Sequence, residues 1–108
     1  MFIRLDFATG ALTLEQPDDC TAFHVEAVGA SAPTTTSVAD GLGLVGRVAD
    51  DEHVWVEMAS VRQMASGQVE PGWPDDFDAM VDFARSNGWV DESGSALRAH
   101  IVWSGAPI

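Results

Sequence analysis

The sequence predicts an α+β fold: a mainly antiparallel sheet of about five to six short strands, with one main amphipathic helix and one or two short helices packed on one face. Short segments that alternate apolar and polar residues occupy much of the first 58 positions. One long segment, about 75–87, has helical periodicity, and a further alternating segment follows it. We expect residues 1–108 to form a single α+β domain, because a chain this short cannot build two separate cores.

The first part of the chain predicts three strands. Alternation over 2–7 and 11–15, joined by a turn at 8–10, is typical of a hairpin. After a break at Pro17, alternation resumes over 21–28. The outward positions of this third strand hold His24, Glu26 and Val28.

The middle of the chain predicts a loop, a short helix and a strand. Segment 29–36 is rich in small residues and has no periodicity, which indicates a mobile loop. Ser37, followed three residues later by Asp40, resembles a helix start. The helix should be brief, since glycine is unfavourable within helices, and a strand should follow near 44–48.

A strand and a short helix are predicted next. Segment 53–58 alternates, with Val54, Val56 and Met58 inward and His53, Trp55 and Glu57 outward. Residues 60–65 then have apolar residues at helical spacing.

The main helix, about 75–87, has the clearest pattern in the chain. Its predicted buried stripe comprises Phe77, Met80, Val81 and Ala84, widened by Phe83. Pro74 suits a first helical turn, and Gly88 suits the left-handed position just past a helix end. After a polar turn at 91–94, the last strand should place Leu97, Ala99, Ile101 and Trp103 inward and Arg98, His100 and Val102 outward.

Composition excludes two classes of partner. The chain carries 17 acidic residues, five arginines and no lysine, for a net charge of -12. Such a chain repels phosphate backbones and anionic lipid, so we expect no nucleic acid and no membrane surface as partner. Arg4 and Asp6 interrupt the first apolar segment, so it does not read as a signal peptide. A single cysteine, Cys20, fits a reducing cytoplasm, where we expect the protein to lie.

The three histidines form one candidate set for chemistry. His24, His53 and His100 all fall on outward strand positions, as do Glu26 and Glu57. Imidazole and carboxylate groups together can transfer protons near neutral pH or bind a zinc-type ion. The alternative function is therefore a small acid–base or metal-dependent enzyme. No motif for a cofactor is present, and an ordinary half-exposed sheet face accounts for the same pattern.

The outward face also suggests association, which is our leading prediction. Trp55, Val28 and Val102 lie among the charged groups, with Arg98 beside them in the pattern. A tryptophan on an exposed strand often marks an interface. The sequence thus favours a non-enzymatic association domain that binds itself, as a homodimer, or another protein. A third class, a small-molecule binding module, would require a concave apolar pocket.

Overall fold

The structure is a computed structural model that describes residues 1–29 and 34–104. Its strands are β1 Phe2–Asp6, β2 Ala11–Glu15, β3 His24–Val28, β4 Gly46–Val48, β5 His53–Glu57 and β6 Ala96–Ser104. The α-helices are α1 Thr35–Leu42, α2 Met58–Ala65 and α3 Trp73–Ser86, and a short 3₁₀ helix, η1, spans Gly43–Val45. The α+β prediction is confirmed.

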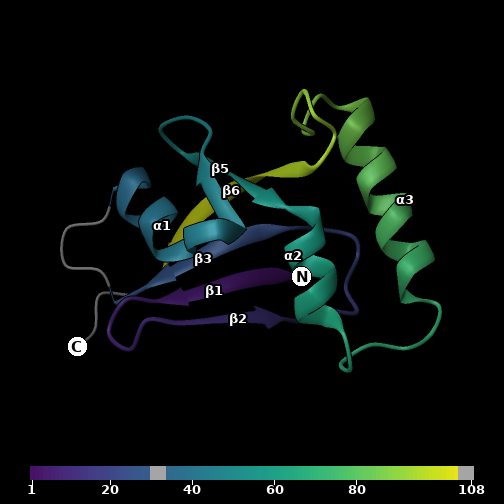
Figure 1. Ribbon diagram of the computed structural model, residues 1–108, viewed down its shortest axis with the longest axis horizontal. Coiled ribbons are helices and arrows are strands. Elements are labelled where there is room, and N and C mark those ends of the chain that lie inside the picture. Colours follow the sequence, from purple (N-terminus) through teal and green to yellow (C-terminus); the bar gives the residue numbers. More distant parts are fainter. Residues whose placement is uncertain (30–33, 105–108) are drawn as a thin grey trace.

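The six strands form one mixed sheet in the order β2-β1-β3-β6-β5-β4 (Figure 1). The pairs β1–β2, β5–β6 and β4–β5 are antiparallel, whereas β1–β3 and β3–β6 are parallel. The parallel pairs arise because β3 inserts beside β1 on the edge opposite β2, and β6 then inserts between β3 and β5. Strand β6, the longest, therefore joins the two halves of the sheet.

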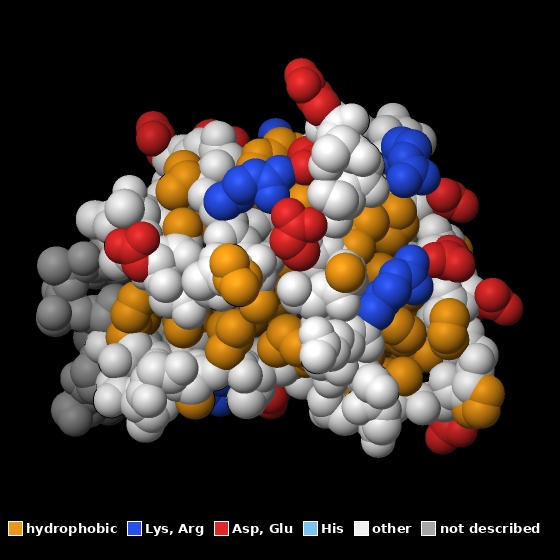
Figure 2. Space-filling model, viewed as in Figure 1, with side chains coloured by type: hydrophobic (Ala, Val, Ile, Leu, Met, Phe, Trp, Pro, Cys, Tyr) orange, Lys and Arg blue, Asp and Glu red, His pale blue; other side chains and the backbone are white. Residues whose placement is uncertain are grey.

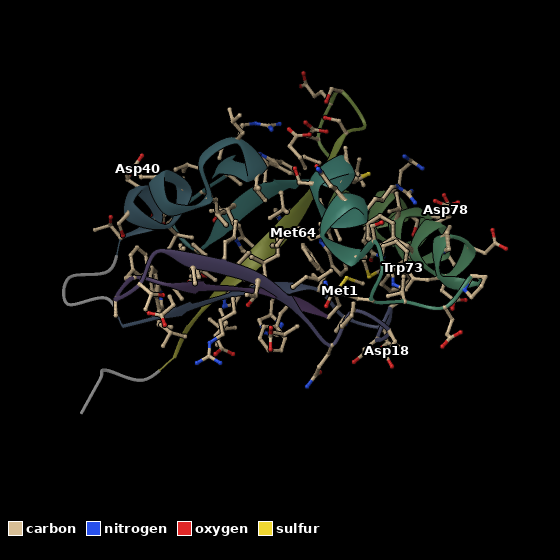
Figure 3. All side chains as sticks on the ribbon, turned by 60° about the horizontal axis from the view of Figure 1, so that its bottom comes forward. Met1, Asp18, Asp40, Met64, Trp73 and Asp78 are labelled. Carbon is tan, nitrogen blue, oxygen red and sulfur yellow. The ribbon has the colours of Figure 1, made fainter. Side chains whose placement is uncertain are left out.

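All three helices lie on one side of the sheet (Figures 1 and 3). Helices α1 and α2 lie over the strands, and α3 stands along one end of the sheet. Seen from the helix side, acidic side chains are scattered over the surface rather than gathered at one place (Figure 2). Beneath the helices lies a single apolar core, whose fully buried large side chains are Ile3, Leu5, Val25, Val38, Val54, Val56, Val61 and Phe77.

Helix α3 follows the predicted pattern at its buried stripe but not at its edge. Phe77, Val81 and Ala84 are buried, as expected, and Trp73 joins them. Met80 is only half-buried. Phe83 is 62% exposed, so the prediction that it widens the buried stripe was wrong. The helix contacts the core along a narrow line of residues spaced four or three apart. Phe83 lies outside this line and packs against Trp89, with ring centroids 5.9 Å apart.

The end of α3 forms as the sequence indicates. Gly88 has φ 76°, a left-handed conformation, just past the C-cap Asn87. The Gly88 N–H donates to the Arg85 carbonyl at 3.1 Å, and the Trp89 N–H donates to the Ala84 carbonyl at 2.9 Å. These two bonds make a Schellman motif, which ends the helix and sets the direction of Trp89.

The short helices differ from prediction at their starts. Helix α1 is capped by Thr34, whose side chain accepts from the Ser37 N–H, so Ser37 is the third helical residue rather than the cap. Packing explains why this helix has a glycine at position 41, because a Cβ on Gly41 would lie 2.6 Å from Leu5 Cδ2. Helix α2 begins at Met58, where we expected the strand to continue. Of the predicted loop 29–36, residues 30–33 lie outside the described residues.

Strand β6 alternates as predicted over most of its length. Leu97, Ala99 and Ile101 are buried beneath the helices, and His100 points the other way. Trp103, which we expected to be buried, is 44% exposed. It lies next to the end of the strand, past Ile101.

Candidate functional site

The candidate site is the face of the sheet that carries none of the described helices, which we call the open face (Figure 3). Side chains on alternate strand positions point away from the helices there. Every residue predicted for catalysis or binding lies on this face: His24, Glu26, Val28, His53, Trp55, Glu57, Arg98, His100 and Val102.

The strand register places the three histidines side by side. His24 on β3 is the register partner of His100 on β6, and His100 is in turn the partner of His53 on β5. The rings of His53 and His100 meet edge to face, with centroids 5.2 Å apart. On the far side, Phe2 stacks on His24 at 4.8 Å. We call His53, His100 and His24 the histidine row.

Different neighbours surround the two outer histidines. Asp50 Oδ1 lies 2.7 Å from His53 Nδ1, which holds that ring in place. The Glu52 N–H and then His53 lower the pKa of Asp50, so it stays a carboxylate at neutral pH. At His24, burial and the nearby Met1 amino group lower the pKa of the imidazole, which favours its neutral form.

The two predicted carboxylates, Glu26 and Glu57, do not form a joint site with the histidine row. Glu57 Oε1 accepts a hydrogen bond from Arg47 at 2.8 Å. Along β5, Trp55 lies between Glu57 and His53. Glu26 lies 4.0 Å from Arg4 and follows His24 by two positions on β3. Within 1–29 and 34–104, no group of three or more His, Cys, Asp or Glu side chains is arranged to hold a metal ion.

The predicted binding residues fall into two groups on either side of the histidine row. Trp55 lies between Arg98 on β6 and Arg47 on β4, its register partners. At the other end, Val102 is the partner of Glu26, and Val28 is the partner of Ser104. The four predicted binding residues share a face, but they do not form one compact patch. They are Trp55, Arg98, Val28 and Val102.

Sequence reasoning missed three residues of this region. Asp50 lies in a predicted turn, and only the closure of that turn brings it to His53. Phe23 and Trp89 lie outside the strands, yet they line a cavity of about 190 Å³ with His53, Arg98 and His100. The Trp89 carbonyl accepts from the Arg98 N–H at 2.8 Å, which fixes the two side by side. A tryptophan directly after a helix-ending glycine was the available signal.

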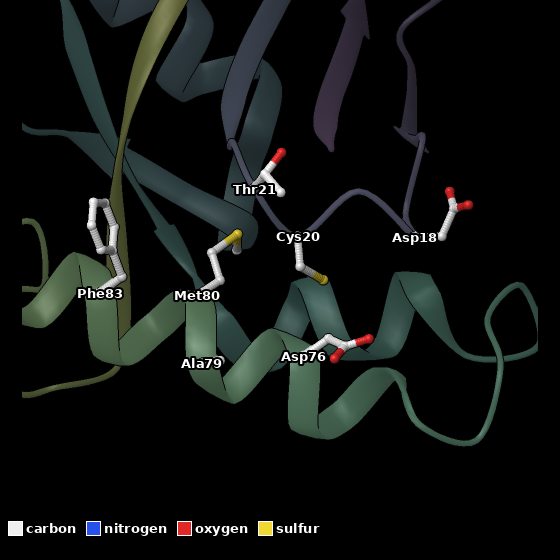
Figure 4. A pocket seen from close by; sticks show the side chains of 7 residues that line it. All are labelled: Asp18, Cys20, Thr21, Asp76, Ala79, Met80 and Phe83. Atoms are coloured by element: carbon white, nitrogen blue, oxygen red, sulfur yellow. The ribbon is translucent and has the colours of Figure 1, made fainter.

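A larger hollow of about 500 Å³ lies between α3 and the segment before β3 (Figure 4). Asp76, Ala79, Met80 and Phe83 line it from the helix, and Asp18, Cys20 and Thr21 line it from the opposite side. The Cys20 side chain points toward the helix near Asp76. Burial, and then the Asp76 carboxylate, raise the pKa of the Cys20 thiol, so the reactive thiolate is disfavoured.

The stripe of acids on α3 is a charged helix surface. Asp82 Oδ1 lies 3.3 Å from Arg85 Nη1, and Asp78 Oδ1 lies 2.6 Å from Arg62 Nη2. Exposed pairs of this kind contribute about 0–1 kcal/mol each to stability.

Comparison of the chain with known protein families, with curated proteins and with solved structures finds no match. The functional conclusion therefore depends on the site itself. Among the helices that the structure describes, none is both long and apolar enough to span a bilayer.

Proposed function

We propose that this protein is a non-enzymatic association domain of the cytoplasm that forms a homodimer through its open face. The observation that supports this is the distribution of charge. Outward strand positions carry four carboxylates, at Asp6, Glu15, Glu26 and Glu57. They also carry three arginines, at Arg4, Arg47 and Arg98, and all three histidines.

The rest of the molecule is strongly negative, since the whole chain has 17 acidic residues and five arginines. Two copies therefore repel each other over most of their surfaces, and the open face is where this repulsion is smallest. A second copy is the occupant that this charge distribution favours.

The open face is also suited to pairing with itself. Consider a two-fold axis lying along the histidine row. It would bring the end with Trp55 and Arg98 against the end with Glu26 and Val102 of the second copy, placing cation near carboxylate and ring near aliphatic side chain. Such isologous contacts are typical of symmetric dimers. The apolar part comes from Phe2, Val28, Trp55 and Val102, of which Val102 is 39% exposed.

Sedimentation equilibrium at neutral pH tests the proposal. We expect a dimer for the wild type and a monomer for Trp55→Arg, because the new charge would be buried at the interface without a partner. Leu44→Arg is the matched control, since Leu44 is 98% exposed and lies away from the open face, on η1. A monomeric wild type, or a Trp55→Arg variant that dimerises like the control, would contradict the proposal.

A second candidate is an acid–base or metal-dependent enzyme at the histidine row. It is favoured by the 2.7 Å contact between His53 and Asp50 and by the adjacency of His100. A carboxylate on Nδ1 orients an imidazole for proton transfer or metal binding through Nε2. Metal analysis of protein purified without a histidine tag tests the metal-dependent form. No bound metal, together with a melting temperature unchanged by zinc, would eliminate it.

A further inference from the structure

The cavity beside the histidine row has the composition of an anion site. Its five lining residues are two aromatic rings, Phe23 and Trp89, and three nitrogen-bearing side chains, His53, Arg98 and His100. No carboxylate is among them. In a chain with 17 acidic residues, this local composition is distinctive.

Arg98 differs from the other four arginines. Arg4, Arg47, Arg62 and Arg85 each have a carboxylate oxygen within 4.0 Å. In the described part of the chain, Arg98 alone has none, although it is half-buried. A guanidinium group presents parallel N–H donors that match a carboxylate. Its fork is thus available for a ligand.

One histidine, His100, can supply a further donor. The Asp50 carboxylate accepts from the Nδ1–H of His53, so Nε2 of the neutral His53 ring is an acceptor and does not donate to an anion. His100 lies edge to face against this ring and is exposed. Two imidazoles thus line the same cavity as the arginine.

A second, more enclosed cavity of about 90 Å³ adjoins the first and is lined mostly by apolar side chains. It shares Phe23, Trp89 and Arg98 with the first cavity, and Met80, Phe83 and Leu97 add to its walls. Sites for drug-sized ligands have volumes of roughly 300–1,000 Å³. The two cavities, at about 190 and 90 Å³, are smaller, so they suit a single ring or a short chain.

We propose that these joined cavities bind a small organic carboxylate with one aromatic ring or a short apolar chain. The carboxylate pairs with the Arg98 guanidinium, and His100 donates a further hydrogen bond. The ring lies between Phe23 and Trp89 and extends toward Met80 and Phe83. A single chain supplies all residues of this site. Arg98 and the two histidines also lie on the open face, so ligand binding competes with the proposed homodimer for Arg98.

Isothermal titration calorimetry with 3-phenylpropionate at neutral pH tests the proposal. We expect saturable one-site binding to the wild type, weakened at least tenfold by Arg98→Gln, because charge-assisted hydrogen bonds are lost. Arg85→Gln is the matched control and should bind as the wild type does, since Arg85 pairs with Asp82 on α3. The uncharged 3-phenylpropanamide and the ringless acetate should each bind at least tenfold more weakly.

Melting curves establish that each variant is folded. If Arg98→Gln does not fold, His100→Gln, at an exposed strand position, takes its place and should weaken binding several-fold. No saturable heat with the wild type, equal affinity in Arg98→Gln, or equal affinity for acetate would overturn the proposal. Sedimentation of the same samples reports dimerisation, and titration at a protein concentration where the wild type is monomeric distinguishes failure of this proposal from failure of the dimer proposal.

Discussion

The two faces of the sheet are built from the same strands, yet they differ in nearly every property. On the helix side, Val25, Val54 and Ile101 are almost fully buried. Their neighbours one position along the chain, such as Glu26 and Val102, are at least partly exposed on the open face. In a strand, a shift of one residue moves a side chain from one environment to the other. Stability should therefore depend on one face and recognition on the other.

The two faces also differ in the kind of side chain they carry. The helix side is apolar, and no buried polar or charged residue is found among the described residues. The open face holds all three histidines and three of the five arginines. Substitutions in matched pairs, one buried residue and one exposed residue, test whether stability depends on the buried side alone.

We expect the largest difference in the free energy of unfolding between substitutions of two phenylalanines on α3. Phe77 is fully buried, and Phe77→Ala should lower the free energy of unfolding by about 3–5 kcal/mol. Phe83 is 62% exposed, and Phe83→Ala should lower it by less than about 1 kcal/mol. Urea unfolding followed by circular dichroism measures both. Equal losses would show that α3 does not dock through the Phe77 stripe.

A second pair compares adjacent residues of β6. Ile101→Ala should lower the free energy of unfolding by about 2–5 kcal/mol, because it leaves a cavity beneath the helices. Val102→Ala, on the open face, should change it by only about 0.5 kcal/mol in the monomer. Urea unfolding at low protein concentration makes the test. If Val102→Ala is the more damaging change, the two faces of the sheet are assigned the wrong way round.

The smallest effect concerns pH. Burial lowers the folded-state pKa of His24 below its ordinary value of 6.5, so the unfolded chain binds the proton more readily. This contribution destabilises the fold as the pH falls through 6.5 to the lowered value, and it is absent at higher pH. His24→Gln should lose less stability than the wild type between pH 7 and pH 5. Thermal unfolding of the wild type and His24→Gln across this range measures the difference.

Much of the fold could be predicted from residue patterns. Alternation identified β1, β2, β3, β5 and β6, and helical periodicity identified α3, including its end at Gly88. The errors lie at the edge of a helical stripe and near the end of a strand. Phe83 fits a wide helical stripe but falls outside the narrow line that touches the core, and Trp103 keeps the inward alternation where the strand is ending.

The site could be predicted only as a list of residues on one face. Nothing in alternation places Asp50 beside His53, because a turn brings them together. Nor does it place Phe23 and Trp89 against Arg98, since neither lies in a strand. The joined cavities therefore could not be foreseen, although the arginine and two of the histidines that line them were all candidates.

Residue order along the chain is enough to assign each strand residue to one side of the sheet, because side chains alternate with a period of two whatever the neighbouring strand. Which strands are neighbours, and in what register they pair, is set by the packing of the folded chain. Those two choices set His24, His100 and His53 in one row, and they leave Arg98 next to Trp89 without a carboxylate. They depend on long-range packing of the whole chain, which no local pattern encodes.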